Sequence, residues 1–244
     1  MVSHSLLNIV QLGLGFFLNF FAFNSQGFIE EPVIESAAKR QNINVHAGYY
    51  SLSIIYATFT LGNFVAAPII DILSPKWGMC LAALCYAAFQ AGFLQISEVY
   101  LYISSAILGF GAAILWTGQG TYLAQNSNEK TSGRNSGLLW ALSEGSLLGG
   151  GVFLFIVFHS SETTDNISTS TVRILYGVFT ALACLSSLTF ALLRPVRVAK
   201  VREGKPQYGR LLGSTFRLMF TKRMFLLAIV FAYTGIEQAF WTGY

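Results

Sequence analysis

Seven stretches of this chain are long and apolar enough to cross a lipid bilayer, and they constrain its fold more than any other feature. A helix needs about 20 residues to span a hydrocarbon core about 30 Å thick. The seven stretches hold 147 of the 244 residues but only two of the 26 charged side chains. They cover residues 6–23, 49–70, 77–96, 99–122, 137–158, 174–193 and 224–244. The sequence therefore predicts an all-α membrane protein.

A soluble fold does not account for this composition. Charged residues make up 11% of the chain and hydrophobic residues 54%, whereas a soluble domain has about 25% charged residues. None of the seven stretches has the polar stripe that a helix facing water needs. This excludes a disordered chain, a basic nucleic-acid-binding module and a small disulfide scaffold. Stretch 6–23 follows no Lys or Arg and precedes no small-x-small cleavage site, so we expect a retained first helix rather than a signal peptide.

The basic residues predict how the helices are oriented. Twelve of the fifteen Lys and Arg residues lie after the second, fourth and sixth stretches, and three lie on the opposite side. Cytoplasmic loops carry the excess of Lys and Arg, so the N-terminus is predicted to be cytoplasmic. Asn166, in the sequence Asn-Ile-Ser, would then be a non-cytoplasmic glycosylation candidate. The short loop leaves two alternatives open, a modified Asn166 and one too near the bilayer for glycan transfer.

The order of the stretches predicts the domain organisation. Residues 1–193 read as a six-helix half of a major-facilitator-type fold, 194–223 as a basic cytoplasmic linker, and 224–244 as a seventh helix opening an incomplete second half. We therefore expect a chain truncated at helix seven, whether as a gene product, an isoform or a partial gene model.

The linker has the composition of an amphipathic helix. Over residues 208–223, apolar side chains recur at helical spacing and alternate with Arg210, Arg217, Lys222 and Arg223. Such a helix lies on the cytoplasmic leaflet and attracts anionic lipid. A basic tail that only satisfies the positive-inside rule is the alternative, and surface contact with the bilayer follows from both.

Two carboxyl groups inside the stretches are candidate functional residues. Glu144 lies in the fifth stretch and Glu237 in the seventh. An ionisable residue at the bilayer centre costs roughly 2.5–3.5 kcal/mol on insertion scales, so it is a functional hypothesis by default. Glu144 reads either as a protonation site or as a neutral group hydrogen-bonded to a neighbouring helix. Glu237 has the same two interpretations, with a partner expected in a second half.

Neutral polar and aromatic residues extend this set. Asn19, Asn63, Gln119 and Trp116 lie within stretches and fit either the wall of a wet central cavity or hydrogen bonds between helices. Small residues at spacing four, such as Gly137, Ala141, Gly145 and Gly149, predict close helix packing, as does Gly109.

No catalytic, cofactor or metal motif accompanies these residues. The chain has no G-x-x-x-x-G-K and no G-x-S-x-G sequence. Its three cysteines lie inside stretches without metal-ligand spacing, and we interpret them as packing residues. We expect no enzymatic activity, no cofactor, no metal and no nucleic-acid partner.

Three short motifs carry a resemblance to a known family. They are Trp-Thr-Gly-Gln-Gly at 116–120, Gly-Arg-Asn-Ser-Gly at 133–137 and Ala-Tyr-Thr-Gly-Ile-Glu at 232–237. With these motifs the whole chain resembles the Unc-93-like branch of the major facilitator superfamily, over about half of that family's length.

The resemblance implies a twelve-helix membrane protein. Founding relatives act as regulatory subunits of a potassium channel or as trafficking partners of membrane receptors. The chain departs from transporting facilitators, because Asp71 remains in the loop after the second stretch but Ala67 and Ile72 stand where that loop's pattern has other residues. The Arg that transporters often place in the fourth helix is also absent from 107–122.

Two functions remain as hypotheses. The first is a non-enzymatic regulatory or accessory protein that acts on other membrane proteins such as channels or receptors. The alternative is an orphan secondary transporter of an unknown small solute, inactive without a second half.

Overall fold

The described part of the chain is almost entirely helical. The computed structural model describes residues 4–39, 43–159, 167–196, 209, 213 and 217–242, with side chains up to residue 237. Its elements are α1 (His4–Ala38), α2 (Ala47–Gly92), the short 3-10 helix η1 (Phe93–Gln95), α3 (Glu98–Gln125), α4 (Ser132–His159), α5 (Thr169–Ala191) and α7 (Lys222–Thr242). The chain divides into two compact units, Met1–Arg197 and Val198–Tyr244, called unit 1 and unit 2 below. The described residues hold no strand, and the all-α prediction is confirmed.

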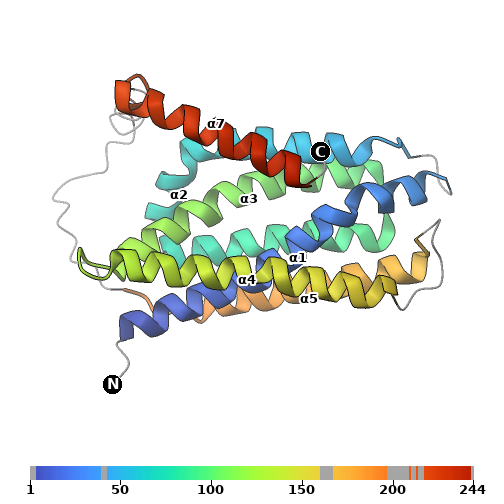
Figure 1. The fold of residues 1–244 in the computed structure, drawn as a ribbon, viewed down its shortest axis with the longest axis horizontal. Coiled ribbons are helices and arrows are strands. Elements are labelled where there is room, and N and C mark those ends of the chain that lie inside the picture. The colour runs from blue at the N-terminus through green and yellow to red at the C-terminus, as the bar shows by residue number, and fades with distance from the viewer. Residues whose placement is uncertain are drawn as a thin grey trace. The chain divides into compact units, whose positions relative to one another are not determined.

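Helix α2 contains two membrane-length segments. Ser74 has φ 67° and ψ 155°, which breaks the helix. Gly78 lies directly against the Ile70 side chain, although a straight helix would separate residues eight positions apart by about 12 Å. The chain therefore reverses at Ser74 (Figure 1), and the segments before and after it contact each other next to the turn.

Five described helices are long and apolar enough to cross a membrane, namely α1, α2 continued through η1, α3, α4 and α5. With α2 counted as two segments, they account for the first six predicted stretches. Unit 2 contains α7, a helix of 21 residues. Its crossing of the membrane and the proposed division at residues 193 and 223 remain predictions.

Helix α1 is longer than the sequence indicated. We expected a loop after residue 23, but α1 continues without a break to Ala38. The charges of Glu30, Glu31 and Glu35 suggested the loop. Val33 and Ile34 are fully buried and recur at helical spacing with Ile29 and Ala37, so the apolar face continues beyond the predicted end.

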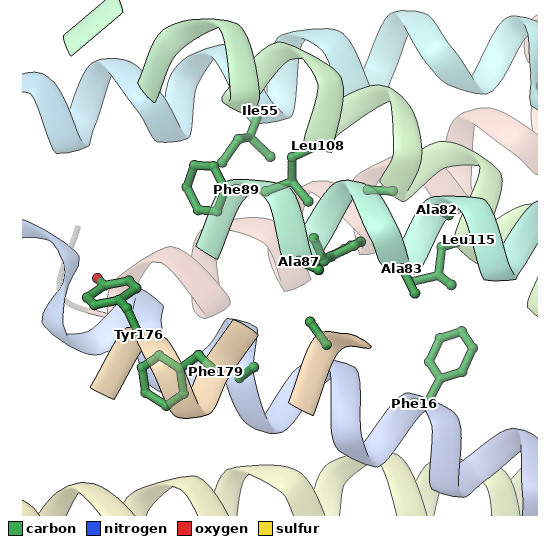
Figure 2. Close-up of a cluster of buried hydrophobic side chains, with 14 of the residues drawn as sticks. Phe16, Ile55, Ala82, Ala83, Ala87, Phe89, Leu108, Leu115, Tyr176 and Phe179 are labelled. Carbon is green, nitrogen blue, oxygen red and sulfur yellow. The ribbon is translucent and has the colours of Figure 1, made fainter. Parts of the chain in front are cut away.

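The second segment of α2 runs through the core of unit 1. Figure 2 shows Ala83, Ala87 and Phe89 of this segment between the α3 side chains and those of α1 and α5. Leu108 of α3 and Phe179 of α5 are both fully buried there. Small alanines on the central segment let α1, α3 and α5 approach it closely, as expected where lipid supplies no hydrophobic drive between helices.

The closest contact in this core is between α2 and α3. A Cβ atom placed on Gly109 would overlap the Ile55 carbonyl oxygen and the Thr58 hydroxyl, and one placed on Gly62 would lie 3.0 Å from the Ala113 side chain. On α4, Gly149 lies against Phe21 of α1, whereas Gly137 has no neighbour within 4 Å. The predicted small-residue stripe of α4 therefore packs only toward its C-terminal end.

We predict that Gly109→Ala lowers thermal stability, whereas Gly120→Ala in the same helix does not. The added methyl at 109 meets backbone, while at 120 it meets nothing within 4 Å. Overpacking of this kind costs about 1–3 kcal/mol. Both changes gain the same helix propensity, so their difference isolates the overlap. The check is the apparent melting temperature in detergent, and equal melting temperatures for the two variants would contradict the packing described here.

Candidate functional site

The interior face of α1 carries a stripe of buried polar side chains. Asn8, Asn19, Gln26 and Glu30 are 7%, 0%, 1% and 3% exposed. Successive members are 11, 7 and 4 residues apart, which are close to whole turns of a helix with 3.6 residues per turn. Helix α1 therefore presents a polar stripe to the interior of unit 1, interrupted between Asn8 and Asn19 by buried Leu12 and Phe16.

Glu30 forms the centre of a contact among three helices. The Gln26 amide nitrogen donates a hydrogen bond to Glu30 Oε2, and the Ser51 hydroxyl of α2 lies beside the same carboxyl group. Ser51 Oγ is 2.9 Å from Ser105 Oγ of α3, and Ser105 Oγ donates to the Leu101 carbonyl at 2.6 Å. Glu30 Oε1 has no hydrogen-bond partner among the described residues.

This carboxyl group lacks a basic neighbour. The described residues contain a single ion pair, Lys39 with Glu35, at 3.3 Å on the exposed side of α1. A buried charge is costly unless it is paired. Glu30 is therefore a buried carboxyl group whose neighbours Gln26 and Ser51 are neutral hydrogen-bonding side chains.

Two buried amide side chains, like the carboxyl group of Glu30, have polar atoms without a hydrogen-bond partner among the described residues. Asn19 of α1 and Gln90 of α2 are fully buried, and none of their side-chain nitrogen and oxygen atoms has a partner among the described residues. A buried polar atom without a partner costs about 1–3 kcal/mol. Such groups in a native structure point to function or to bound water, and Asn19 was a sequence candidate.

Trp116 joins α3 to α1 and α4. Its ring lies 5.5 Å from that of Phe16 and 5.3 Å from that of Phe20, and it stacks on Trp140 at 5.9 Å between centroids. Gln119, one turn further along α3, is 8% exposed. Trp116 therefore packs at the meeting of α1, α3 and α4, and Gln119 is buried on the same helix.

Glu144 and Asn63 face away from the interior. On α4, Ser143 and Ser146 are buried, while the Glu144 side chain between them is exposed on the outer face. Asn63 is exposed on α2 and donates a hydrogen bond to the Phe59 carbonyl of its own helix at 2.8 Å. The structure does not bring either residue to the α1 stripe.

The remaining candidates lie in unit 2 or outside the described residues. Glu237 is exposed on α7, as are Lys222 and Arg223 at its start and Arg217 before it. Asn166 and Arg210 lie outside the described residues, as do seven of the sixteen residues of the predicted amphipathic helix over 208–223.

The sequence patterns did not single out Glu30, Gln26 or Gln90 as candidate functional residues. The signal was present in the spacing from Asn8 to Glu30, which keeps one helix face over 22 residues. Because Glu31 and Glu35 are charged as well, this part of the chain resembled a loop, and the spacing was not recognised as a helix face.

The described residues contain no group of three or more His, Cys, Asp or Glu side chains that could hold a metal ion. The three cysteines are free thiols. Cys80 is buried with its sulfur 3.3 Å from Ser187 Oγ, Cys85 is half-buried, and Cys184 is exposed.

The fold and the buried stripe define an integral multi-pass membrane protein. Residues 39–244 match the family described as the ion channel regulatory protein UNC-93. The chain belongs to the UNC-93 family, which confirms the resemblance in its motifs.

Curated relatives come from animals and plants. UNC93-like protein MFSD11 of Xenopus laevis is 35% identical over 99% of this chain and 57% of its own length. Protein unc-93 homolog A of Bos taurus is 28% identical over 98% of the chain and 60% of its own length. UNC93-like protein 3 of Arabidopsis thaliana is 27% identical over 94% and 50%. The chain thus spans little more than half of these relatives, and no solved structure matches it significantly.

We predict that Glu30→Gln preserves stability and Glu30→Ala reduces it. Glutamine keeps the shape and can still accept from Gln26, whereas alanine leaves Gln26 unpaired at a cost of about 1–3 kcal/mol. Glu35→Gln serves as the control, because an exposed ion pair contributes about 0–1 kcal/mol. The measurement is thermal unfolding in detergent. If Glu30→Gln were as unstable as Glu30→Ala, the site would require the negative charge itself.

Proposed function

We propose that this chain is part of a non-enzymatic accessory protein that acts on other membrane proteins through the outer face of α4. The observation that carries the proposal is the exposed carboxyl group of Glu144 on a helix that crosses the membrane. The description of the matching family, an ion channel regulatory protein, supports the same function.

The outer face of α4 is broad and apolar apart from Glu144. In the most apolar 18-residue window of α4, 22% of residues are buried, compared with 50% for α3. Its exposed side chains are Trp140, Leu147, Leu148, Val152, Phe155 and Ile156. An apolar face of this kind suits either lipid or another helix.

Glu144 favours another helix. A carboxyl group facing hydrocarbon costs roughly 2.5–3.5 kcal/mol, and a hydrogen-bond donor on an adjacent helix removes much of that cost. The donor can come from the further length that the curated relatives have, or from a separate membrane protein. In either case the α4 face is a helix-packing surface, and for the accessory function we infer that a channel subunit contacts it.

We predict that Glu144→Leu abolishes the effect of this protein on a co-expressed potassium channel, the channel class that the family resemblance implies. Glu144→Gln should keep most of the effect, because an amide still hydrogen-bonds across helices. Whole-cell current and co-purification of the tagged channel in mild detergent are the two readouts.

Glu35→Gln, an exposed change on α1, is the matched control and should behave as wild type. A Glu144→Leu protein that remains monodisperse, and still alters current and co-purifies with the channel, would overturn the proposal.

A second candidate function is transport of a small solute, and buried Glu30 favours it. Carboxyl groups inside a bundle serve as proton relays in pumps and transporters. Alternating access requires two repeats that move against each other, so the test uses a form with the length of the curated relatives. Proton uptake into liposomes that is lost in Glu30→Gln would support transport. Uptake equal in wild type and variant would exclude Glu30 as the coupling group.

We also propose a cytoplasmic N-terminus, which the placement of Lys and Arg residues supports. If the protein lies in the plasma membrane, antibody should stain an epitope tag before residue 1 only after that membrane is made permeable. If the protein lies in an internal membrane, the tag should be stained once the plasma membrane alone is opened. A tag inserted at residues 161–165 should give the opposite pattern. Staining of the N-terminal tag from the non-cytoplasmic side would contradict this orientation.

A further inference from the structure

We propose that a cationic cleft at one end of unit 1 binds the phosphate group of a small anion or of a lipid headgroup. The cleft has a volume of about 630 Å³ and is lined by the start of α1, the connection from α3 to α4 and the residues that follow α5. It is separate from the apolar face of α4, and its lining includes Arg194 at the start of the predicted basic linker.

The charge of the lining is entirely of one sign. Arg134 and Arg194 line the cleft together with His4, and none of its lining residues is Asp or Glu. Glu129 lies in the connection between α3 and α4 but is not part of the lining. Two guanidinium groups without a carboxylate between them form a site for an anion.

The N-terminus of α4 adds to this positive potential. Helix α4 begins at Ser132 and has no acidic residue in its first turn, while Thr131 and Arg134 at that end line the cleft. The start of a helix carries partial positive charge and free backbone N–H groups. Here that charge is reinforced by arginine instead of being neutralised.

The floor of the cleft is held in place by buried asparagines. Asn8 Nδ2 donates to Asn126 Oδ1 at 2.7 Å, and Asn135 Nδ2 donates to Ser127 Oγ at 3.0 Å. Asn8, Asn126 and Asn135 are 7%, 8% and 0% exposed. These bonds tie α1, α3 and α4 together, so the cleft is preorganised for binding.

Both arginines are held in position and keep guanidinium N–H groups that are not used in hydrogen bonds to other described residues. Tyr122 of α3 donates to the Arg194 carbonyl at 2.8 Å, which anchors the residues after α5. Arg194 Nη1 lies 3.1 Å from His4 Nδ1, and Arg134 Nη2 donates to Asn135 Oδ1 at 3.3 Å. A guanidinium has five N–H donors, so each arginine can still bind a phosphate oxygen pair.

The place of the cleft matches the depth of lipid phosphates. It lies where four membrane-length helices begin or end, at the boundary between their apolar windows and the connecting residues. Phosphate groups of lipids occupy this level of a bilayer. The volume is in the range of small-molecule sites, about 300–1,000 Å³, which suits an inositol phosphate headgroup better than a single inorganic phosphate.

The test measures binding by the purified full chain in neutral detergent. Three anionic probes are used, a short-chain phosphatidylinositol bisphosphate, soluble inositol trisphosphate and inorganic phosphate, with short-chain phosphatidylcholine as the neutral lipid. Wild type should bind a phosphate-bearing probe and not phosphatidylcholine. Arg134→Gln and Arg194→Gln should each weaken binding about tenfold, the loss expected for a charge-assisted hydrogen bond.

Two controls separate the cleft from general charge effects. Arg173→Gln removes one positive charge from an exposed position on α5, and the triple change Arg217→Gln, Lys222→Gln, Arg223→Gln removes charge from unit 2. Both should bind inositol trisphosphate as wild type does. If the arginine-to-glutamine variants are unstable, Arg194→Lys is the alternative. Lysine keeps the positive charge but lacks the paired N–H donors of the guanidinium group, so this folded variant should bind with intermediate affinity.

The outcomes are distinct. Binding of inositol trisphosphate comparable to that of the lipid identifies a soluble phosphate compound as a ligand, while binding of the lipid alone identifies the headgroup in its membrane. Unchanged affinity in the Arg134 and Arg194 variants, loss of binding in the unit 2 variant alone, or equal binding of phosphatidylcholine would each overturn the proposal.

Discussion

The polar stripe of α1 is the constraint on which unit 1 depends. A membrane interior offers no water to solvate an amide or a carboxyl group, so each buried polar atom must find its partner on another helix or remain costly. Asn8 finds Asn126 of the α3–α4 connection, and Glu30 reaches toward Ser51 of α2. The stripe thus fixes which faces of α2 and α3 meet α1, while the alanines of α2 decide how closely they approach.

Two of the carboxyl groups on the membrane-length helices, Glu30 and Glu144, have opposite environments. Glu30 is enclosed inside unit 1, where Gln26 donates to one of its two oxygens. Glu144 is exposed on α4, and the partner proposed for it lies beyond unit 1. The bundle therefore carries one buried carboxyl group and one exposed carboxyl group.

Sequence patterns predicted the crossing segments well, because the absence of charge over about 20 residues has few other physical causes. The segments 49–70 and 77–96 were separated correctly, although only Ser74 breaks the helix between them. The predicted end of α1 was wrong, since three glutamates within the six residues 30–35 resemble a loop unless it is known that one of them is buried. The site was predicted less well. Asn19 was a candidate and is buried on the α1 stripe, but the partners of each side chain depend on how helices pack, which a single sequence does not encode in local pattern.

The reversal at Ser74 has a consequence for how the protein enters the membrane. Its backbone conformation lies in a region that residues other than glycine rarely adopt, and one residue makes the whole turn. Because the connection between the two segments is so short, they cannot cross the bilayer one at a time. We expect them to insert together as a helical hairpin. Lys76 stands directly after the turn with its ammonium group 5.1 Å from the centre of the Trp77 ring. Lys76 and Trp77 thus stand together at the turn of the hairpin, and both residue types favour the boundary between hydrocarbon and water.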